Sequence, residues 1–158
     1  MIDEDKQFKK WHLVIFGIII LIFIILKLSN VFYWHKAKVE IGGQTIKVLV
    51  ADTVSHQTKG WSGAGDMGSV QGMWFKFNSR IPHAMVMRDM EFPLDIAWID
   101  NGMIVDIAPN LAPEKDRAEA ELAIYRPRLP ADAVLELPAG FTAAHGIKIG
   151  DRVKFIEP

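Results

Sequence analysis

An uninterrupted apolar run near the N-terminus restricts the fold of this chain more than any other feature. The fourteen residues Leu13–Leu26 carry no polar side chain. A helix from Trp11 to Trp34 would be roughly 36 Å long at about 1.5 Å per residue, enough to cross the apolar core of a bilayer. Aromatic residues at both ends are typical of the membrane–water interface. The sequence therefore predicts a polar tail at 1–10, a transmembrane anchor in contact with membrane lipid at 11–34, and one globular domain at 35–158.

The same segment does not have the pattern of a cleaved signal peptide. Cleavage needs small residues at the −3 and −1 positions, but Ala37 is preceded two residues earlier by His35, and Ser29 by Lys27. The chain has no cysteine, which excludes lipoprotein processing. Lysines lie on both sides of the segment in nearly equal number, so the positive-inside rule does not orient it. We expect an uncleaved single-pass anchor in the cell membrane, with the large domain extracytoplasmic.

Composition limits the chemistry of the domain. The whole chain carries 18 basic and 19 acidic residues, and no basic stripe is present, which argues against a nucleic-acid partner. The absence of cysteine excludes disulfides, thiol chemistry and cysteine-ligated zinc. The histidines lack the close pairing of a zinc site. We therefore expect neither a metal nor another cofactor.

Alternating apolar and polar residues predict a mostly β domain. Gly42-Gly43 joins two alternating runs, and Asp100-Asn101-Gly102 joins two more, as in β-hairpins. Asp52-Thr53 is typical of a helix cap. We expect a mostly β (α+β) fold, a compact antiparallel β-barrel-like domain with two short helices. The predicted strands are 38–41, 45–50, 73–77, 83–87, 94–99, 103–107, 132–137 and a last one ending at 155; the helices are 54–59 and 141–145; the long connections are 60–72 and 108–130.

Several spaced motifs carry a family resemblance. Phe92-Pro93-Leu94-Asp95-Ile96 and Val134-Leu135-Glu136-Leu137-Pro138-Ala139-Gly140 follow a glycine-rich loop in one order. This order resembles the family called domain of unknown function 192 (DUF192) over nearly all of residues 38–155. The resemblance implies a compact, mostly β domain, often secreted or membrane-anchored, and no established activity. The family usually has two aromatic residues where Met85 and Val86 stand, and Lys-Asn where this chain has Arg88-Asp89.

Charged residues concentrate between the predicted strands 83–87 and 94–99. A structural interpretation pairs an arginine with a carboxylate to fix the loop, with Asp95 tying its corner. Carboxylates with well-separated pKa values can also act as acid and base, or bind Ca²⁺ or Mg²⁺. Trp61, in the glycine-rich loop, could stack on a sugar. The candidate ligand-binding residues are therefore Arg88, Asp89, Glu91, Asp95 and Trp61.

Three functions remain open. We expect a membrane-anchored extracytoplasmic binding or interaction module, whose ligand is a small molecule, a glycan or a protein. One alternative is a hydrolase-type enzyme that uses Arg88, Asp89 and Asp95. The other is a Cu(I)-binding domain, because His83, Met85 and Met87 would share one face of a strand and offer imidazole and thioether ligands. Methionines in a strand are more often packing residues than ligands.

Overall fold

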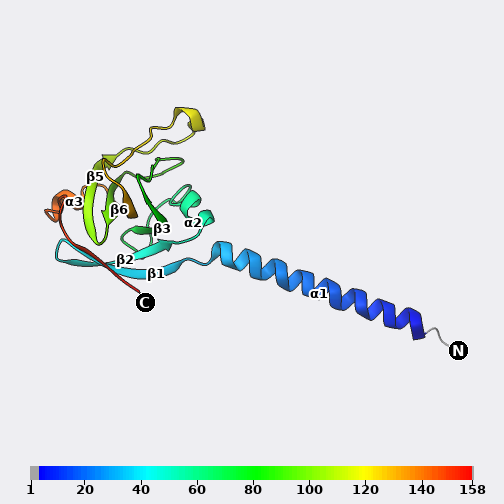
Figure 1. Ribbon diagram of the computed structural model, residues 1–158. Helices are drawn as coiled ribbons and strands as arrows, with labels where there is room; N and C mark the ends of the chain where they lie inside the picture. The colour runs from blue at the N-terminus through cyan, green and yellow to red at the C-terminus, as the bar shows by residue number, and fades with distance from the viewer. Residues whose placement is uncertain (1–3, 158) are drawn as a thin grey trace. The chain divides into compact units, whose positions relative to one another are not determined.

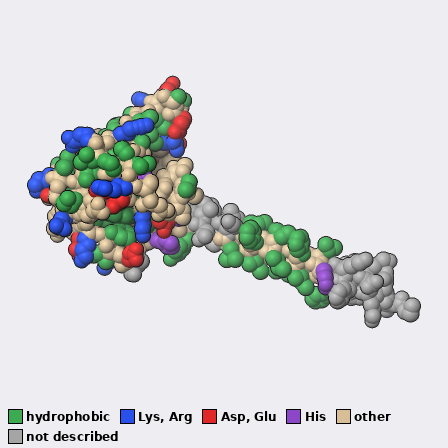
Figure 2. Space-filling model, viewed as in Figure 1, with side chains coloured by type: hydrophobic (Ala, Val, Ile, Leu, Met, Phe, Trp, Pro, Cys, Tyr) green, Lys and Arg blue, Asp and Glu red, His purple; other side chains and the backbone are tan. Residues whose placement is uncertain are grey.

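The computed structural model describes residues 4–157, and side chains for residues 11–26 and 33–157. It divides into two units, Met1–Tyr33 and Trp34–Pro158, and each is described by itself. In the first, helix α1 spans Glu4–Phe32. Every described side chain of α1 is exposed, and Figure 2 shows apolar side chains covering its visible face. Within the described residues, no helix has the length and apolarity that crossing a membrane requires.

The second unit is built on one sheet of seven strands (Figure 1). The strands are β1 (His35–Ile41), β2 (Gln44–Ala51), β3 (Met73–Ile81), β4 (Leu94–Asp100), β5 (Met103–Leu111), β6 (Ala131–Pro138) and β7 (Val153–Ile156). Their order in the sheet is β5-β4-β6-β3-β2-β1-β7. All neighbours are antiparallel except β2 and β3, which are parallel. The prediction of an antiparallel domain is wrong for this pair, because residues 52–72 form the crossover that parallel strands need.

The sheet is curled into a half-barrel, so that its two edges approach each other. Met103 at the start of β5 forms an isolated bridge with Arg152, just before β7. The Ile104 amide donates to the Asp151 carbonyl over 3.0 Å, and the Val153 amide to the Gly102 carbonyl over 2.9 Å. Two short α-helices accompany the sheet, α2 (Val54–Lys59) and α3 (Phe141–Ala144). The mostly β architecture with short helices is thus confirmed.

Apolar residues cover both faces of the sheet. Along β6, Leu135 and Leu137 belong to one buried cluster and Val134 to another, as expected when successive side chains point to opposite faces. Trp74 and Phe75 divide in the same way along β3. A polar side chain in the middle of β6 is therefore buried on whichever face it lies.

Two predicted strands differ from the observed structure. Residues 83–87 do not form a strand; Met85 makes an isolated bridge with Tyr125, and the Met87 carbonyl accepts a hydrogen bond from the Glu114 amide. β5 continues beyond residue 107 to Leu111, through Pro109, which an edge strand tolerates because one side of its backbone has no partner. The connection to β6 is anchored by Arg128, whose guanidinium binds Asp106 of β5 at 2.7 Å. The same long connection supplies Tyr125, the bridge partner of Met85.

Replacing Gly72 with alanine is expected to destabilise the domain by about 1–3 kcal/mol, the usual cost of overpacking. An added Cβ would lie 2.5 Å from the carbonyl oxygen of Glu136, where β3 meets β6. Gly65→Ala is the matched control, because nothing lies within 4 Å of its Cβ position. Urea unfolding measures both; equal stability of the two variants would contradict this packing.

Candidate functional site

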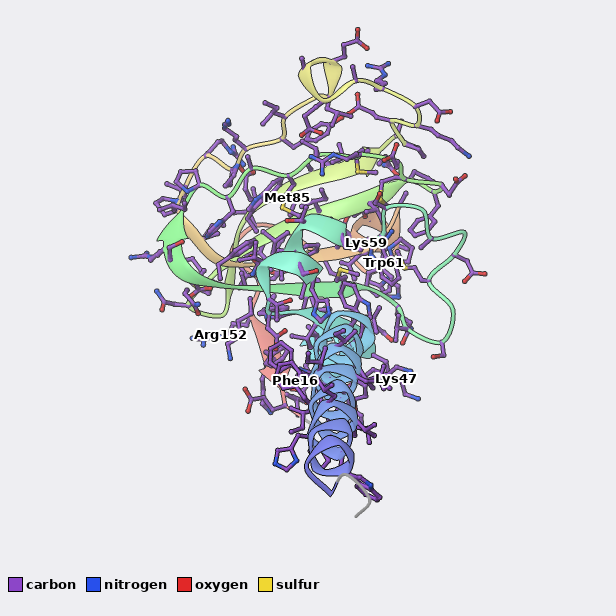
Figure 3. The ribbon with its side chains drawn as sticks, turned by 90° about the vertical axis from the view of Figure 1, so that its right-hand side faces the viewer. Phe16, Lys47, Lys59, Trp61, Met85 and Arg152 are labelled. Carbon is purple, nitrogen blue, oxygen red and sulfur yellow. The ribbon has the colours of Figure 1, made fainter. Side chains whose placement is uncertain are left out.

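A cavity of about 230 Å³ opens between α2, the loop after it and residues 84–90. Its lining combines aromatic and thioether groups with a few charged side chains. Figure 3 labels three of the lining residues, and they lie on the same side of the domain around α2. The lining includes Lys59, Trp61, Phe75, Met85, Arg88 and Glu136.

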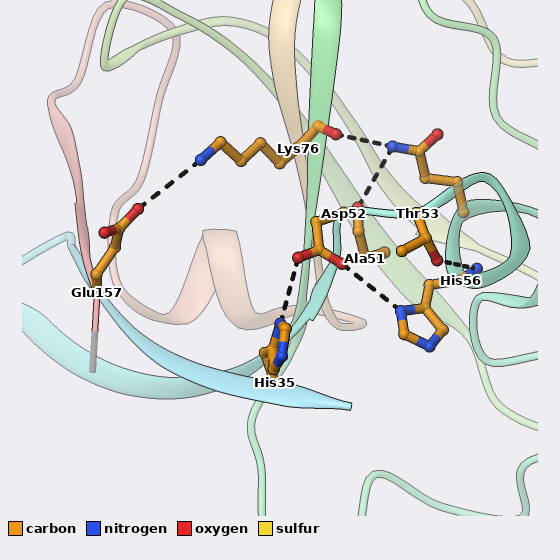
Figure 4. A network of polar contacts seen from close by, with 8 residues as sticks. His35, Ala51, Asp52, Thr53, His56, Lys76 and Glu157 are labelled. Atoms are coloured by element: carbon orange, nitrogen blue, oxygen red, sulfur yellow. Dashed lines mark hydrogen bonds and ion pairs between the residues drawn. The ribbon is translucent and has the colours of Figure 1, made fainter. Parts of the chain in front are cut away.

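Helix α2 is fixed at one wall of this cavity by polar contacts at its start (Figure 4). The Thr53 hydroxyl accepts a hydrogen bond from the His56 amide at 3.1 Å, which is the predicted helix cap. Asp52 lies 3.2 Å from the His35 ring on β1 and 3.7 Å from the His56 ring. The Gln57 amide donates to the Lys76 carbonyl of β3 at 2.7 Å. These contacts hold the helix to the sheet.

Glu136 is the unusual residue in the lining. It lies in the middle of β6, is only 4% exposed, and its Oε2 has no hydrogen-bond partner in the described part of the chain. Burial raises the pKa of the Glu136 carboxyl to about 8, so it is mostly protonated at neutral pH. Buried polar atoms without partners are uncommon in native proteins, and each calls for a physical explanation.

Trp61 carries the second unpartnered polar atom. The side chain is buried and packs edge-on against Phe92, with 5.9 Å between ring centroids. Its indole Nε1 is buried and has no acceptor among the described residues. The structure thus places Trp61 in the cavity lining, with its ring in the core and not displayed on the surface of the glycine-rich loop.

Arg88 also lines the cavity, but its charge is already paired. The guanidinium makes a two-pronged contact with Glu119, including Nε to Oε2 at 2.7 Å. Glu119 begins the short 3₁₀ helix Glu119–Glu121 in the long connection. This pair joins the loop predicted from sequence to the connection, as the structural interpretation of an arginine–carboxylate pair expected, although the partner is Glu119 and not a neighbouring acid.

The other acids of that loop lie apart from one another. Asp89 adopts a left-handed backbone, with φ of 49°, and its carbonyl accepts a hydrogen bond from the Gly63 amide at 2.9 Å. Glu91 forms an ion pair with Lys115 at 2.7 Å. No hydrogen bond or ion pair in the described chain joins Arg88, Asp89 and Asp95. The structure does not assemble the arrangement that the hydrolase hypothesis needs.

Asp95 is fully buried and serves the fold. Its carboxylate accepts hydrogen bonds from the amides of Asn110, Gly140 and Thr142 at 2.9–3.0 Å, and from the Thr142 hydroxyl at 2.6 Å. Burial alone would raise the pKa of Asp95, but these hydrogen bonds outweigh it, and the pKa is lowered. Asp95 therefore ties β4 to the end of β5 and the start of α3, and leaves no oxygen free for a ligand.

The residues of the copper hypothesis separate into two environments. Met87 is fully buried, and Met85 and Met90 join it in the same apolar cluster. The His83 ring stacks on Phe77 with 3.6 Å between centroids and lies 2.8 Å from the Ser79 carbonyl. Within the described residues, no group of three or more His, Asp or Glu is placed to hold a metal ion. The methionines act as packing residues here.

Sequence reasoning missed Glu136. Glu136 lies on the same side of the strand as Asp132 and Val134, and an acid in such a position is usually placed on a solvated face. The available signal was that Leu135 and Leu137 on one side and Val134 on the other were all apolar, which is typical of a strand buried on both faces. An acid between the apolar residues in the middle of such a strand is a candidate site residue.

The curled sheet and its cavity define a small, mostly β domain with a candidate ligand site. Residues 37–155 match the family described as "Uncharacterized ACR", DUF192, and the chain belongs to this family, as its motifs indicated.

Two crystal structures resemble this chain. One is a protein of Sinorhizobium meliloti described as a candidate transcription regulator, with 31% identity and a TM-score of 0.68, covering 77% of this chain and 95% of that one. The other is a protein of unknown function from Novosphingobium aromaticivorans, with 28% identity and a TM-score of 0.65, covering 77% and 84%. No curated protein matches the chain.

Proposed function

We propose that this protein is a membrane-anchored, extracytoplasmic binding module that takes a small ligand in the cavity around Glu136. One observation carries the binding proposal: two buried polar atoms, Glu136 Oε2 and Trp61 Nε1, lack partners in the lining of the same cavity. An unmade hydrogen bond of a buried group costs about 1–3 kcal/mol. A ligand that supplies both partners recovers this free energy on binding.

The lining limits the chemistry of the ligand. The Glu136 carboxyl, with its pKa raised to about 8 by burial, is a neutral hydrogen-bond donor at pH 7, and the Trp61 indole is a donor too. Met85, Met90 and Phe75 offer apolar contacts. The volume of about 230 Å³ lies below the range of roughly 300–1,000 Å³ typical of drug-sized sites. The ligand is therefore a small, uncharged molecule with hydrogen-bond acceptors at one end.

A thermal-shift screen of small polar molecules, with the full chain in detergent at pH 7, tests this binding. Compounds that raise the melting temperature should act less on Trp61→Phe, which keeps the ring but removes the N–H donor. Trp74→Phe is the matched control, because Trp74 belongs to the apolar cluster on the other face of the sheet. A stabilisation that both variants retain equally would place the ligand elsewhere and defeat the proposal.

The anchoring proposal has separate support. The run Leu13–Leu26 is entirely apolar, and its side chains are exposed along α1, where only an apolar environment would cover them. The protein should remain in the membrane pellet after an alkaline wash, and protease added outside intact spheroplasts should digest the domain. Release by the wash would refute the anchor, and full protection of the domain would refute the orientation.

A further inference from the structure

A second hollow of about 400 Å³ lies on the domain, away from the Glu136 cavity. Three lysines line it: Lys36 and Lys38 of β1, and Lys47 of β2. Ala37, Val70 and Ile156 give it an apolar portion. All three lysines are exposed, and Figure 3 shows Lys47 projecting outward from the domain.

The charges in this hollow are not balanced by the protein. Lys38 and Lys47 are directly opposite each other across the β1–β2 pair, an arrangement that is unfavourable for like charges. Among the described residues, none of the three ammonium groups has an acidic or carbonyl partner. The hollow's one acid, Glu157, lies 3.8 Å from the ammonium of Lys76.

The remaining lysines of the domain show the opposite pattern. Each one that the structure describes has an oxygen partner within 4.0 Å. The pairs are Lys59 with the Ser62 carbonyl, Lys76 with Glu157, Lys115 with Glu91, Lys148 with Asp151, and Lys154 with Glu40. The uncompensated lysine charge is thus confined to one hollow.

We propose that this hollow binds the phosphate of an anionic membrane lipid. The inference rests on the proposed anchoring, because that brings lipid within reach. Lys36 follows Trp34, the last residue of the apolar segment, by two positions, and Lys38 by four. At about 3.3 Å per residue in a strand, the two lysines lie within roughly 7 and 13 Å of chain from Trp34. Their charges attract anionic headgroups over such distances, and the apolar portion of the hollow suits the glycerol and upper acyl part of the lipid.

Nucleic acid is the other polyanion that three lysines attract. A duplex needs a longer basic track and an element that enters a groove, usually a helix. Here α2 has six residues and α3 has four, and the hollow lies on strands. The observations therefore favour lipid, and DNA binding becomes a contrary outcome of the test.

The test uses the full chain in two kinds of nanodisc, one of neutral phosphatidylcholine and one that also contains anionic phosphatidylglycerol. An amine-reactive reagent, read out by mass spectrometry, reports the accessibility of each lysine. Lys36, Lys38 and Lys47 should be labelled several-fold more slowly in the anionic discs. Lys115 and Lys148, which have ion-pair partners, should react equally in both.

A variant with Lys36→Gln, Lys38→Gln and Lys47→Gln should lose the preference for phosphatidylglycerol among lipids that remain bound in native mass spectrometry. Each lysine near an anionic surface is worth about fivefold in affinity, so the loss for all three together is on the order of a hundredfold. Arg126→Gln, at an exposed arginine outside the hollow, should keep the preference.

Equal labelling of the three lysines in both discs, or protection that a DNA duplex produces and lipid does not, would overturn the proposal. Failure of the chain to enter either disc would refute the anchoring instead, and the lipid inference would fall with it. These outcomes are distinguishable, because the labelling result is read only from protein that has been recovered in the discs.

Discussion

Replacing Glu136 with glutamine is expected to abolish a fall in stability that the wild-type protein shows as pH rises from about 4.5 to about 8. Unfolded glutamate ionises near 4.5, whereas burial raises the pKa of native Glu136 to about 8. Between these values the native state holds a proton that the unfolded state has released, so the free energy of unfolding decreases with pH. The summed effect is about 5 kcal/mol, since each pKa unit corresponds to about 1.4 kcal/mol.

Glutamine has the shape of the protonated acid and does not ionise. Glu136→Gln should therefore be close to the wild type in stability at pH 5 and more stable by several kcal/mol above pH 8. Urea unfolding at a series of pH values measures the difference between the two proteins, which cancels every other titrating group. Glu121→Gln, at an exposed glutamate, is the control and should give a flat difference. A flat difference for Glu136→Gln as well would mean that its carboxyl is not buried as described.

Replacing Asp95 with alanine is expected to destabilise the domain by several kcal/mol, since each buried donor left without a partner costs about 1–3 kcal/mol. Three amides and the Thr142 hydroxyl would lose their acceptor inside the protein. Glu91→Ala is the matched control in the same loop, because a surface ion pair such as Glu91–Lys115 contributes about 0–1 kcal/mol. Urea unfolding at pH 7 compares them, and a loss below 1 kcal/mol for Asp95→Ala would contradict the structural role.

The lowered pKa of Asp95 adds a pH signature opposite in sign to that of Glu136. Its carboxylate stabilises the fold above the unfolded pKa of 3.8, and this contribution is lost as pH falls further, through the native pKa. A double-mutant cycle with Thr142→Val isolates the shortest of its hydrogen bonds. Measured at a series of falling pH values, the coupling between Asp95 and Thr142 should weaken as the native carboxylate takes up its proton, and a coupling that strengthens on acidification would exclude a charged acceptor.

The β-rich fold could be predicted from sequence wherever one local pattern decided the structure. Alternation and glycine turns identified the hairpins that join β1 to β2 and β4 to β5. The prediction of a strand failed at residues 83–87. Met85 and Met87 alternate with other residues because both pack against the core, and the segment does not belong to the sheet. Their backbone partners come from Tyr125 and Glu114, which are remote in sequence. The parallel β2–β3 pair was missed for the same reason, since strand order across a crossover is a tertiary property.

The candidate site was predicted in part. Arg88 and Trp61 were named from sequence and both line the cavity. Asp89, Glu91 and Asp95 were grouped with them because they are close in sequence, but their side chains have separate roles in the fold. Glu136 was not named, because its burial depends on β6 lying between β4 and β3 with both faces covered. The apolar residues on both sides of 133–137 were a local sign of a strand buried on both faces, but the order of the strands is a tertiary property.

The indole N–H signals of the full-length chain in nanodiscs test the central proposal, ligand binding at Glu136 and Trp61, most directly. ¹⁵N-labelled protein gives a separate signal for each tryptophan, and Trp61→Phe and Trp74→Phe assign the two that matter. When compounds from the thermal screen are titrated at pH 7, the Trp61 signal should shift saturably, the Trp74 signal should stay in place, and Glu136→Leu, which removes the carboxyl donor, should weaken the response. Binding compounds that leave Trp61 unmoved, or that move Trp74 equally, would contradict the account.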